Sequence, residues 1–339
     1  MLMKFSIIIP VYNAEPFLLK CLDSIFNQKF NYAFEVIAIN DASTDDSLSI
    51  INNYAKNEER LIILDQLSNT GQAIARGNGM KIAQGDYIMH VDADDWILEN
   101  AFEEIYKKIQ KYNPDVLILN TYVQNQGKEK VLREYFNFEG FVKKEDLGSY
   151  EIQAAFYQHS GTKVVRRGVA NGLIVSSDEF ETTAEDFLYC FEVFLKSKTI
   201  YLFRNAYYVI NVHDNSLTQR TESYKKMNNQ IVLLNLLKTL LIKYKPIDLI
   251  INNLLIYREK ACVNLALNCW LEGTGEKIEG SKIIEAYQLF PEMEGKRIRS
   301  IEKSLKKKLG ALYFSFKFQG FYSTIVYILK FKTLKLVKK

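Results

Sequence analysis

Two hydrophobic patterns alternate along the first two-thirds of the chain. Short, nearly uninterrupted apolar runs at residues 5–10, 34–40 and 87–91 are typical of strands that are buried on both faces. The segments between these runs carry apolar residues at helical spacing, for example Leu18 and Leu22. Strands that alternate with helices of about 10–15 residues are typical of βαβ units. The pattern therefore predicts an α/β fold with a mainly parallel sheet flanked by helices.

The same patterns extend this prediction along the chain. Further strands are predicted at 61–65, 116–122, 163–167 and 207–212. Helices are predicted at 17–27, 71–83, 100–112 and 184–196, and another helix follows residues 41–47 and ends at about residue 55. The charged, irregular segment 124–147 is predicted to be a connection or a flap. After about residue 223, long helical patterns such as 230–244 and 254–271 replace the alternation. We therefore expect a domain over residues 1–220 and a mainly helical C-terminal region over 221–339.

Composition narrows the class of protein. With 48% hydrophobic and 25% charged residues, the chain has the composition of a folded protein. Its four cysteines are widely spaced and form no C-x-x-C, which indicates neither a zinc site nor a disulfide framework. No run of about 18 uncharged apolar residues predicts a spanning helix, and the first apolar run is too short for a signal peptide. These features predict a cytoplasmic location.

Charge is distributed unevenly along the chain. Residues 303–339 hold ten lysines and no acidic residue, whereas the other 302 residues carry 34 basic and 40 acidic side chains. The lysines flank a segment at 309–329 that is rich in aromatic and aliphatic residues. This pattern favours a tail that binds an anionic membrane surface, peripherally on the inner face of the cell membrane. A nucleic-acid patch and a plain helix packed on the rest of the protein are the alternatives.

Aromatic and acidic residues follow the predicted strands. Tyr12 follows the first strand, Asp41 the second, and Asp92 and Asp94 the fourth. Ligands of open α/β sheets bind beyond these carboxyl ends. Asp92 and Asp94 would point to the same side of an extended chain, and two such carboxylates need a cation or protons between them. Oxygen ligands suit Mg²⁺ or Mn²⁺ bound together with substrate phosphates.

Each of these residues also has a purely structural interpretation. Tyr12 would simply pack, Asp41 would form an Asx-turn, and Asp95 would cap the helix after the fourth strand. Their convergence at one edge of the sheet favours a binding site. No G-x-G-x-x-G follows the first strand and no P-loop motif occurs, which disfavours a dinucleotide fold and a P-loop ATPase.

Six motifs, in their order and spacing, resemble those of family-2 glycosyltransferases. The resemblance covers roughly residues 4–220 and does not extend to residues 221–339. The motifs are Pro10-Val11-Tyr12-Asn13, Asn40-Asp41-Ala42-Ser43-Thr44-Asp45-Asp46-Ser47, Asn69-Thr70-Gly71 with Ala75-Arg76, Val91-Asp92-Ala93-Asp94-Asp95-Trp96, Ala184-Glu185-Asp186-Phe187 and His213-Asp214-Asn215-Ser216-Leu217-Thr218.

The resemblance implies a GT-A fold and inverting transfer of a hexosyl or N-acetylhexosaminyl group from a nucleotide-diphosphate sugar, most often a UDP-sugar. It implies that Asp186 is the general base and that Glu185 contacts the acceptor or positions the loop. It implies that Asp94 binds Mn²⁺ or Mg²⁺, with Asp92 and His213 as further metal-site residues. The donor site that it implies consists of Pro10, Tyr12 and Asp41 around the base, Asn69, Arg76 near the base or pyrophosphate, and Asp92 near the ribose.

Two positions depart from the family pattern. Gly77 follows the motif arginine, where family members often have asparagine, so Asn78 is not a secure site residue. Ala42 stands where the Asp-Gly-Ser turn of the family has glycine.

The implied roles agree with elementary chemistry. Loss of a nucleoside diphosphate builds negative charge, which a divalent ion and Arg76 would stabilise, while one carboxylate assists the attacking hydroxyl. Asp186 would lie at a helix N-terminus, which lowers a carboxylate's pKa and makes proton transfer late.

We therefore expect an enzyme that extends a surface glycan such as lipopolysaccharide, capsule or a related lipid-linked glycan. Its expected partners are the donor, the glycan acceptor and an anionic membrane, without nucleic acid. A nucleotidyltransferase and a catalytically silent nucleotide-sugar- or glycan-binding subunit are the alternatives.

Overall fold

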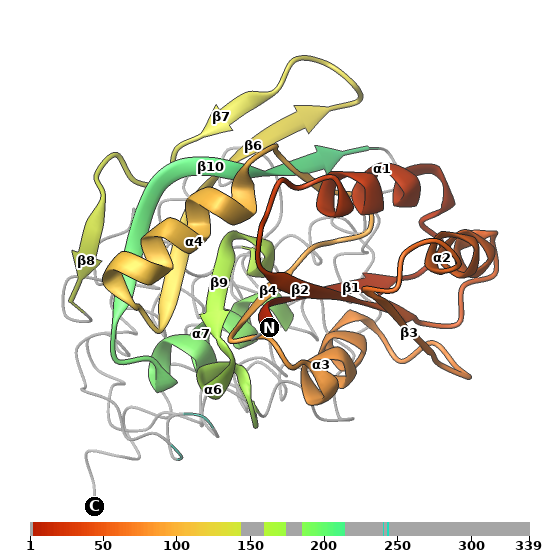
Figure 1. Ribbon diagram of the computed structural model, residues 1–339, viewed down its shortest axis with the longest axis horizontal. Helices are drawn as coiled ribbons and strands as arrows, with labels where there is room; N and C mark the ends of the chain where they lie inside the picture. Colours follow the sequence, from red (N-terminus) through yellow and green to blue (C-terminus); the bar gives the residue numbers. More distant parts are fainter. Residues whose placement is uncertain (1–2, 144–158, 174–184, 214–239, 241–242, 244–339) are drawn as a thin grey trace, which may run out of the picture. The chain divides into compact units, whose positions relative to one another are not determined.

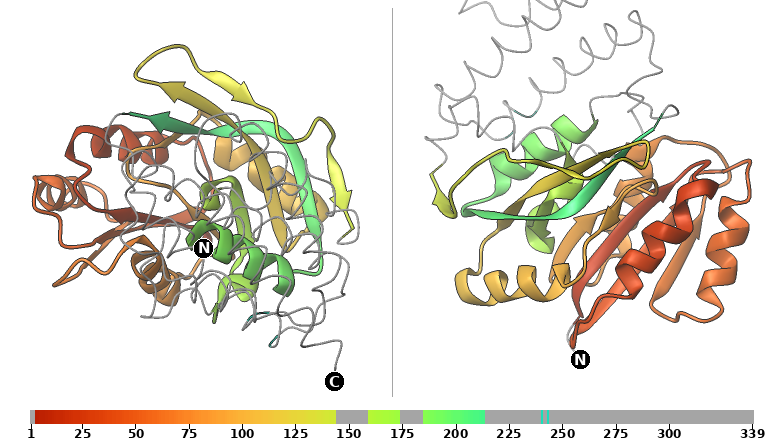
Figure 2. Two further views of the ribbon diagram at one scale, coloured as in Figure 1. Left: turned by 180° about the vertical axis from the view of Figure 1, so that it is seen from behind. Right: turned by 90° about the horizontal axis from the view of Figure 1, so that it is seen from above.

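The described part of the chain forms one ten-stranded sheet with helices on both sides (Figures 1 and 2). The computed structural model describes residues 3–143, 159–173, 185–213, 240 and 243, all within the first of two units, 1–254 and 255–339. The strands are β1 (Met3–Val11), β2 (Ala33–Asn40), β3 (Leu61–Asp65), β4 (Tyr87–His90), β5 (Trp96–Ile97), β6 (Val116–Asn125), β7 (Val131–Arg133), β8 (Gly140–Val142), β9 (Lys163–Arg166) and β10 (Ile200–Val212). The helices are α1 (Glu15–Phe26), α2 (Ser47–Ala55), α3 (Gln72–Ile82), α4 (Ala101–Tyr112), η2 (Ser160–Thr162), α6 (Arg167–Ala170) and α7 (Glu185–Lys196).

The N-terminal half of the sheet is parallel. Its strands lie in the order β3-β2-β1-β4, and every neighbouring pair among them runs in the same direction. The continuous apolar runs predicted these strands because both faces of such a sheet are covered by helices. The predicted α/β class is confirmed, with a parallel sheet in this half of the structure.

The other half of the sheet is mixed. β9 lies antiparallel between β4 and β6, while β10 runs parallel to β6. The short strands β5 and β8 pair antiparallel with β10, and β7 pairs antiparallel with β6. Because β10 crosses this half of the sheet over 13 residues, it carries side chains to the end of β4.

Alternate residues of β1 face two different helical layers. Phe5, Ile7 and Ile9 belong to the main core, together with residues of α1, α2 and α4. Ile8 points the other way, toward α3. Helix α3 packs very close to the sheet there, because a Cβ on Gly79 would lie 2.8 Å from side-chain atoms of Ile8 and Ile39.

Gly85 allows β4 to start directly beside β1. A Cβ at this position would lie 2.5 Å from the backbone carbonyl carbon of Phe5 and from the backbone nitrogen of Ser6. Backbone atoms cannot move aside as a flexible side chain would. Gly85 is therefore a steric requirement for the close approach of β4 to β1, which brings Asp92 and Asp94 to the end of the sheet.

A bulge in β10 redirects its second half. The pairing of β10 with β6 shifts register between Phe203 and Ala206 and again before Tyr208. The buried Asn120 stabilises the bulge, because its side-chain amide donates to the backbone oxygen of Arg204 at 2.7 Å. Bulges re-aim side chains, and here Tyr208 becomes fully buried against the turn after β4.

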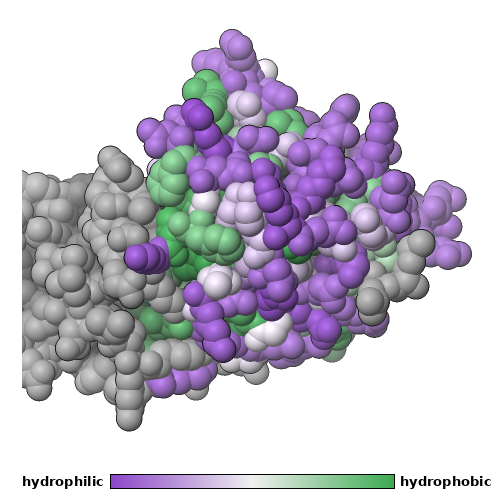
Figure 3. All heavy atoms as spheres, turned by 60° about the vertical axis from the view of Figure 1, so that its left-hand side comes forward, coloured by the Kyte–Doolittle hydropathy of each residue, from purple (hydrophilic) through white to green (hydrophobic). Residues whose placement is uncertain are grey.

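The face of the described residues that is drawn in Figure 3 is largely polar. In the view of Figure 3, hydrophilic residues dominate and hydrophobic ones form small patches. Patches of this kind are ordinary on a folded protein and need no partner to explain them. Among the described residues, no helix is both long and apolar enough to cross a membrane.

The structure corrects two sequence predictions. The segment 124–147, predicted to be an irregular connection or flap, contains the last residues of β6 and the strands β7 and β8. The last predicted strand, 207–212, begins seven residues earlier, at Ile200. The three-residue strands β7 and β8, within a charged segment, and the bulged β10 lack the long continuous apolar pattern on which the prediction relied. The predicted domain boundary near 220 and the lysine-rich tail lie outside the described residues. So do the helices predicted after residue 223, apart from residues 240 and 243 within 230–244.

Candidate active site

The predicted site residues gather at the carboxyl ends of the parallel strands. Tyr12 follows β1, Asp41 follows β2 and Asp92 follows β4 by one residue. The strand order reverses between β1 and β4, and at such a switch point the loops diverge and leave room for a ligand. Pro10 lies within β1 and is buried, whereas Tyr12 is 49% exposed, so Tyr12 does not simply pack in the core.

Asp41 organises the loop between β3 and α3. One of its carboxylate oxygens accepts from the backbone nitrogen of Thr70 at 2.7 Å, and the other accepts from that of Gly71 at 2.8 Å. The side chain of Gln66 donates to the same carboxylate at 2.6 Å. Asn69, also predicted in the donor site, is exposed, and its side-chain oxygen accepts from Gly71. Asp41 thus binds a neighbouring loop instead of forming an Asx-turn.

The turn after β2 has a left-handed residue where the family motif has glycine. Ala42 has φ 56°, a conformation that costs an L-residue more than glycine. The turn is held from the loop after β1, because the side-chain oxygen of Asn13 accepts from the backbone nitrogen of Thr44 at 2.8 Å. The loops after β1 and β2 therefore form one unit.

Arg76 on α3 joins two carboxylates that lie far apart in the sequence. Its guanidinium donates to Asp92 at 2.5 Å and to Asp186 on α7 at 2.6 Å. The arginine is 3% exposed, and the side chain of Gln72 adds a second donor to the same oxygen of Asp92 at 2.8 Å. Such a buried, fork-shaped pairing fixes geometry as well as charge.

The arginine determines the protonation state of Asp186. Burial favours the protonated form, but Arg76, His159 and Lys163 outweigh it and lower the pKa of Asp186 to about 2. The carboxylate is therefore ionised at neutral pH, as expected from its place at the start of α7. Glu185 is the first residue of α7, and its side chain is outside the described part of the structure.

Asp94 forms a separate pair with His213. The carboxylate lies 2.9 Å from the Nε2 atom of His213, which follows β10 directly. The imidazole stacks on Phe17 of α1 with ring centres 4.4 Å apart. Burial and the nearby Asp92 raise the pKa of Asp94, and the contact with His213 offsets part of this rise.

Asp95 is held by β10 and does not cap a helix. One of its oxygens accepts from the hydroxyl of Tyr208 at 2.7 Å, and the other accepts from the backbone nitrogen of Asn211 at 2.8 Å. The same hydroxyl accepts from the backbone nitrogen of Asp92 at 3.0 Å. Burial, Asp92 and Asp94 raise the pKa of Asp95 well above its ordinary value.

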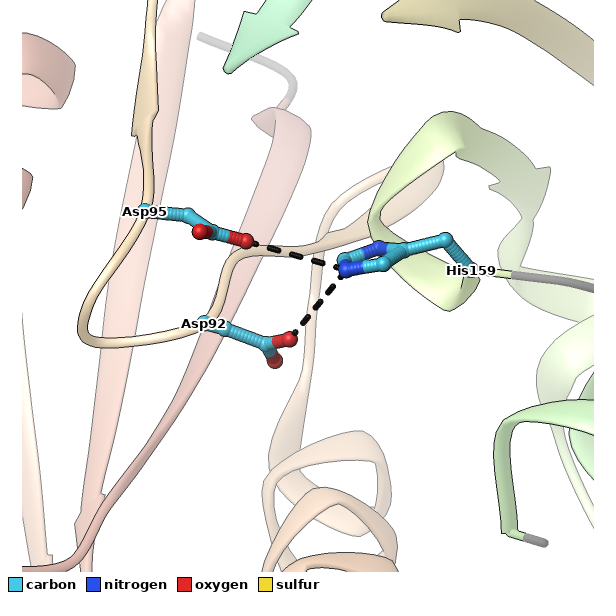
Figure 4. Close-up of side chains that lie close together, drawn as sticks. All are labelled: Asp92, Asp95 and His159. Carbon is cyan, nitrogen blue, oxygen red and sulfur yellow. Dashed lines mark ion pairs between the residues drawn. The ribbon is translucent and has the colours of Figure 1, made fainter. Parts of the chain in front are cut away.

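His159 completes an inner group of side chains that sequence reasoning missed. Its Nε2 atom lies 3.6 Å from Asp92 and 3.7 Å from Asp95 (Figure 4). Potential ligand atoms of these three residues lie within 4.8 Å of one another. Tyr208 and Gln72 were also missed. No motif contains these residues, and only the pairing of β10 and the approach of the 159–163 turn bring them to the site.

Two places offer metal ligands, and they fit an ion differently. At Asp94 and His213 the ligand atoms are 2.9 Å apart, close to the ~3.0 Å expected for neighbouring ligands of an octahedral ion with bonds of about 2.1 Å. Asp94 also retains partial exposure, so substrate oxygens have access. At the inner group, both oxygens of Asp95 already accept hydrogen bonds from protein donors. The outer pair therefore fits a divalent ion better.

The ion pairs of Arg76 predict a pH-dependent stability. Arg76→Met should cost about 3–5 kcal/mol of unfolding free energy at pH 7, because it leaves buried carboxylates unpaired. The folded pKa of Asp186 is lower than the unfolded one, so its stabilisation is complete above about pH 4 and is lost as pH falls toward 2. Urea unfolding should therefore show a gap between wild type and variant that narrows from pH 4 to pH 2.

Arg60→Met is the matched control, since Arg60 pairs with Glu58 at the surface. It should cost less than about 1 kcal/mol at either pH. A gap for Arg76→Met that stays constant between the two pH values would contradict the assigned ion pairs.

Comparison with known proteins agrees with this arrangement. Residues 6–173 match the family described as Glycosyl transferase family 2. The glycosyltransferase GlyA of Streptococcus pneumoniae is 33% identical over 166 residues, which are 45% of this chain and 24% of GlyA. TarP of Staphylococcus aureus, a poly(ribitol-phosphate) β-N-acetylglucosaminyltransferase, is 29% identical over 230 residues, 67% of this chain and 68% of TarP.

The solved structures show the same fold. The crystal structure of S. aureus TarS 1–349 in complex with UDP-GlcNAc superposes with a TM-score of 0.60 at 20% identity, over 84% of this chain and 79% of that one. This likeness confirms the predicted GT-A fold. The chain matches only a quarter of GlyA and 19% of a Bacillus spizizenii poly(ribitol-phosphate) β-glucosyltransferase. The motifs, the fold and the family match together show that this chain belongs to the family-2 glycosyltransferases.

Proposed function

We propose that this chain is an inverting glycosyltransferase that moves a sugar from a UDP-sugar to a hydroxyl of a cell-surface glycan. One observation carries the proposal. Arg76 holds Asp92, at the donor end of the sheet, and Asp186 of α7 in one buried cluster. Arg76 thereby holds the donor site and the proposed base in a constant relative position. Displacement of the diphosphate by the acceptor hydroxyl in a single step requires such an arrangement.

The donor side is formed by the loops after β1, β2 and β4. The exposed ring of Tyr12 provides a face for the uracil base, and Asp41 shapes the loop that borders it. Asp92 keeps one oxygen on Arg76 and Gln72, which supports its predicted role beside the ribose. Its second predicted role, as a metal ligand, stays a prediction.

Asp94 and His213 are the residues that would hold Mn²⁺ or Mg²⁺. A bound divalent ion supplies charge for the diphosphate leaving group. Burial and the neighbouring charge of Asp92 raise the pKa of Asp94, and a bound cation would offset the repulsion between these two carboxylates. Phe17 keeps the imidazole of His213 in place for this role.

Asp186 takes the proton of the acceptor hydroxyl. A carboxylate with a pKa of about 2 is a weak base, so the proton moves only after the hydroxyl oxygen has begun to bond to the sugar carbon. Arg76 stabilises the ionised form before the reaction, and the attack occurs on the face opposite to the leaving diphosphate. The configuration of that carbon inverts.

The acceptor is a polymer at the cell surface. Several relatives are named poly(ribitol-phosphate) glycosyltransferases. Polyol-phosphate chains are therefore candidate acceptors, beside the lipopolysaccharide, capsule or lipid-linked glycan expected from the sequence.

Association with the inner face of the membrane through residues 303–339 stays a prediction from composition. Its test is co-sedimentation with anionic vesicles at low and high salt. The full chain should bind at low salt and dissociate at high salt, and a chain truncated after residue 302 should not bind. Binding that does not depend on salt would contradict the prediction.

The donor assignment predicts the nucleotide preference. With Mn²⁺ present, a UDP-sugar should raise the melting temperature more than GDP-, dTDP- or CMP-sugars, since ligands that bind only the folded state stabilise it. Slow hydrolysis of that donor should release UDP, whereas release of pyrophosphate would identify a nucleotidyltransferase. A GDP-sugar that stabilises the protein more than every UDP-sugar would show that the base site is wrongly assigned. Stabilisation by a donor without any hydrolysis of it would favour a catalytically silent binding subunit.

The division of labour between Asp94 and Asp186 predicts two distinct variant phenotypes. Asp94→Ala should weaken Mn²⁺-dependent donor binding and reduce turnover at least about 10²-fold, as loss of an electrostatic stabiliser does. Asp186→Asn should keep donor binding near normal and reduce transfer by roughly 10²–10⁴-fold, the range for a general base. Calorimetry and UDP-release assays measure the two quantities separately.

Glu104→Ala, on the surface of α4, is the control and should change neither quantity. Equal loss of donor binding in Asp94→Ala and Asp186→Asn would refute the separate roles.

A further inference from the structure

Asp92 and Asp95 need positive charge or hydrogen-bond donors between them. Both follow β4 closely, and Asp95 is almost fully buried. One oxygen of each faces the Nε2 atom of His159, at 3.6 and 3.7 Å, and the three atoms form a triangle (Figure 4). In many carboxylate clusters a metal ion takes such a place. Here a side chain from a distant turn takes it.

The hydrogen bonding of His159 decides which ring nitrogen carries a proton. Its Nδ1 atom accepts from the backbone nitrogen of Gly161 at 3.3 Å. A neutral imidazole has one donor and one acceptor nitrogen, so Nε2 carries the hydrogen and directs it toward the carboxylates. To ligate a metal through Nε2, the ring would have to give up the bond with Gly161.

The turn that carries His159 is built to hold the ring in place. The ammonium of Lys163, itself 1% exposed, donates to the backbone oxygen of His159 at 2.7 Å. The imidazole lies against the ring of Tyr208, with centres 5.2 Å apart. Only glycine fits at 161, because a Cβ there would lie 2.5 Å from the Tyr208 ring. These contacts restrict the position of the His159 ring more than is usual for a histidine on the protein surface.

We propose that His159 is a positioning residue that takes the place of a cation between Asp92 and Asp95. It directs the N–H of Nε2 toward the two carboxylates, at 3.6 and 3.7 Å, which are distances of an electrostatic contact and not of a hydrogen bond. It thereby keeps metal ions out of the inner group, so that a divalent ion binds only at Asp94 and His213. The proposal rests on the proposed function for the location of the metal and the reaction. The positioning role concerns the shape of the turn after β4, with or without an ion.

Two variants of His159 separate donation from packing. His159→Phe keeps a ring against Tyr208 but removes the donor, whereas His159→Gln keeps a donor near the position of Nε2. With saturating donor, His159→Phe should lower kcat by about 10–100-fold, the usual loss when a residue that orients a site residue is removed. His159→Gln should retain most of the activity. Equal kcat values in the two variants, whether low or high, would overturn the positioning role.

Binding of Mn²⁺ alone, followed by the loss of the free-ion EPR signal, tests the exclusion of metal without reference to activity. Wild type and His159→Phe should each bind an ion, and Asp94→Ala should bind none. Adding His159→Phe to Asp94→Ala should restore binding, because the inner group is then open to an ion. If Asp94→Ala still binds Mn²⁺ and the double variant Asp94→Ala with His159→Phe does not, His159 is a metal ligand and the proposal is wrong.

A third outcome distinguishes the proposal from the proposed function. If neither wild type nor His159→Phe binds Mn²⁺, the metal assigned to Asp94 and His213 fails. The difference in kcat between His159→Phe and His159→Gln then decides the positioning role alone. Circular dichroism and melting temperatures of both variants show that each is folded before either comparison is made.

Discussion

Compensation of negative charge at the end of β4 is the constraint on which this site depends. The turn there brings three carboxylates together, and Asp186 adds a fourth from α7. Carboxylates in so small a volume repel one another unless donors or cations lie between them. Arg76 from α3, His213 from the end of β10 and His159 from the turn before β9 provide them. The reaction site exists only when these distant segments have packed.

The compensation divides the carboxylates by role. Asp95 and one oxygen of Asp92 have protein donors throughout, which suits groups that keep the shape of the turn. Asp94 has a single imidazole and keeps a raised pKa, which suits a group that receives a cation with its substrate. Asp186, bound to Arg76, is ionised, as its proposed role as the general base requires. The polar cluster thus contains carboxylates that hold the shape of the turn, Asp92 and Asp95, and carboxylates with proposed roles in the reaction, Asp94 and Asp186.

The parts of the structure that could be predicted from sequence are those with local signals. Apolar runs predicted β1 to β4, and the motifs named Arg76, Asp92, Asp94 and Asp186 without showing which of them are paired. His159 and Tyr208 left no such signal, because a single histidine or tyrosine has many structural uses. Their roles depend on a bulge in β10 and on the absence of a side chain at Gly161, features that arise from tertiary packing.

The most direct test of a single displacement assisted by Asp186 is the configuration of the new glycosidic bond. The account predicts that a UDP-α-sugar gives a β-linked product, read from the proton coupling constant of the anomeric centre by NMR during the first turnovers. No residue of the described structure is assigned as a nucleophile that would form a covalent sugar intermediate. An α-linked product, formed with retention, would contradict the proposed mechanism and the role of Asp186 as base.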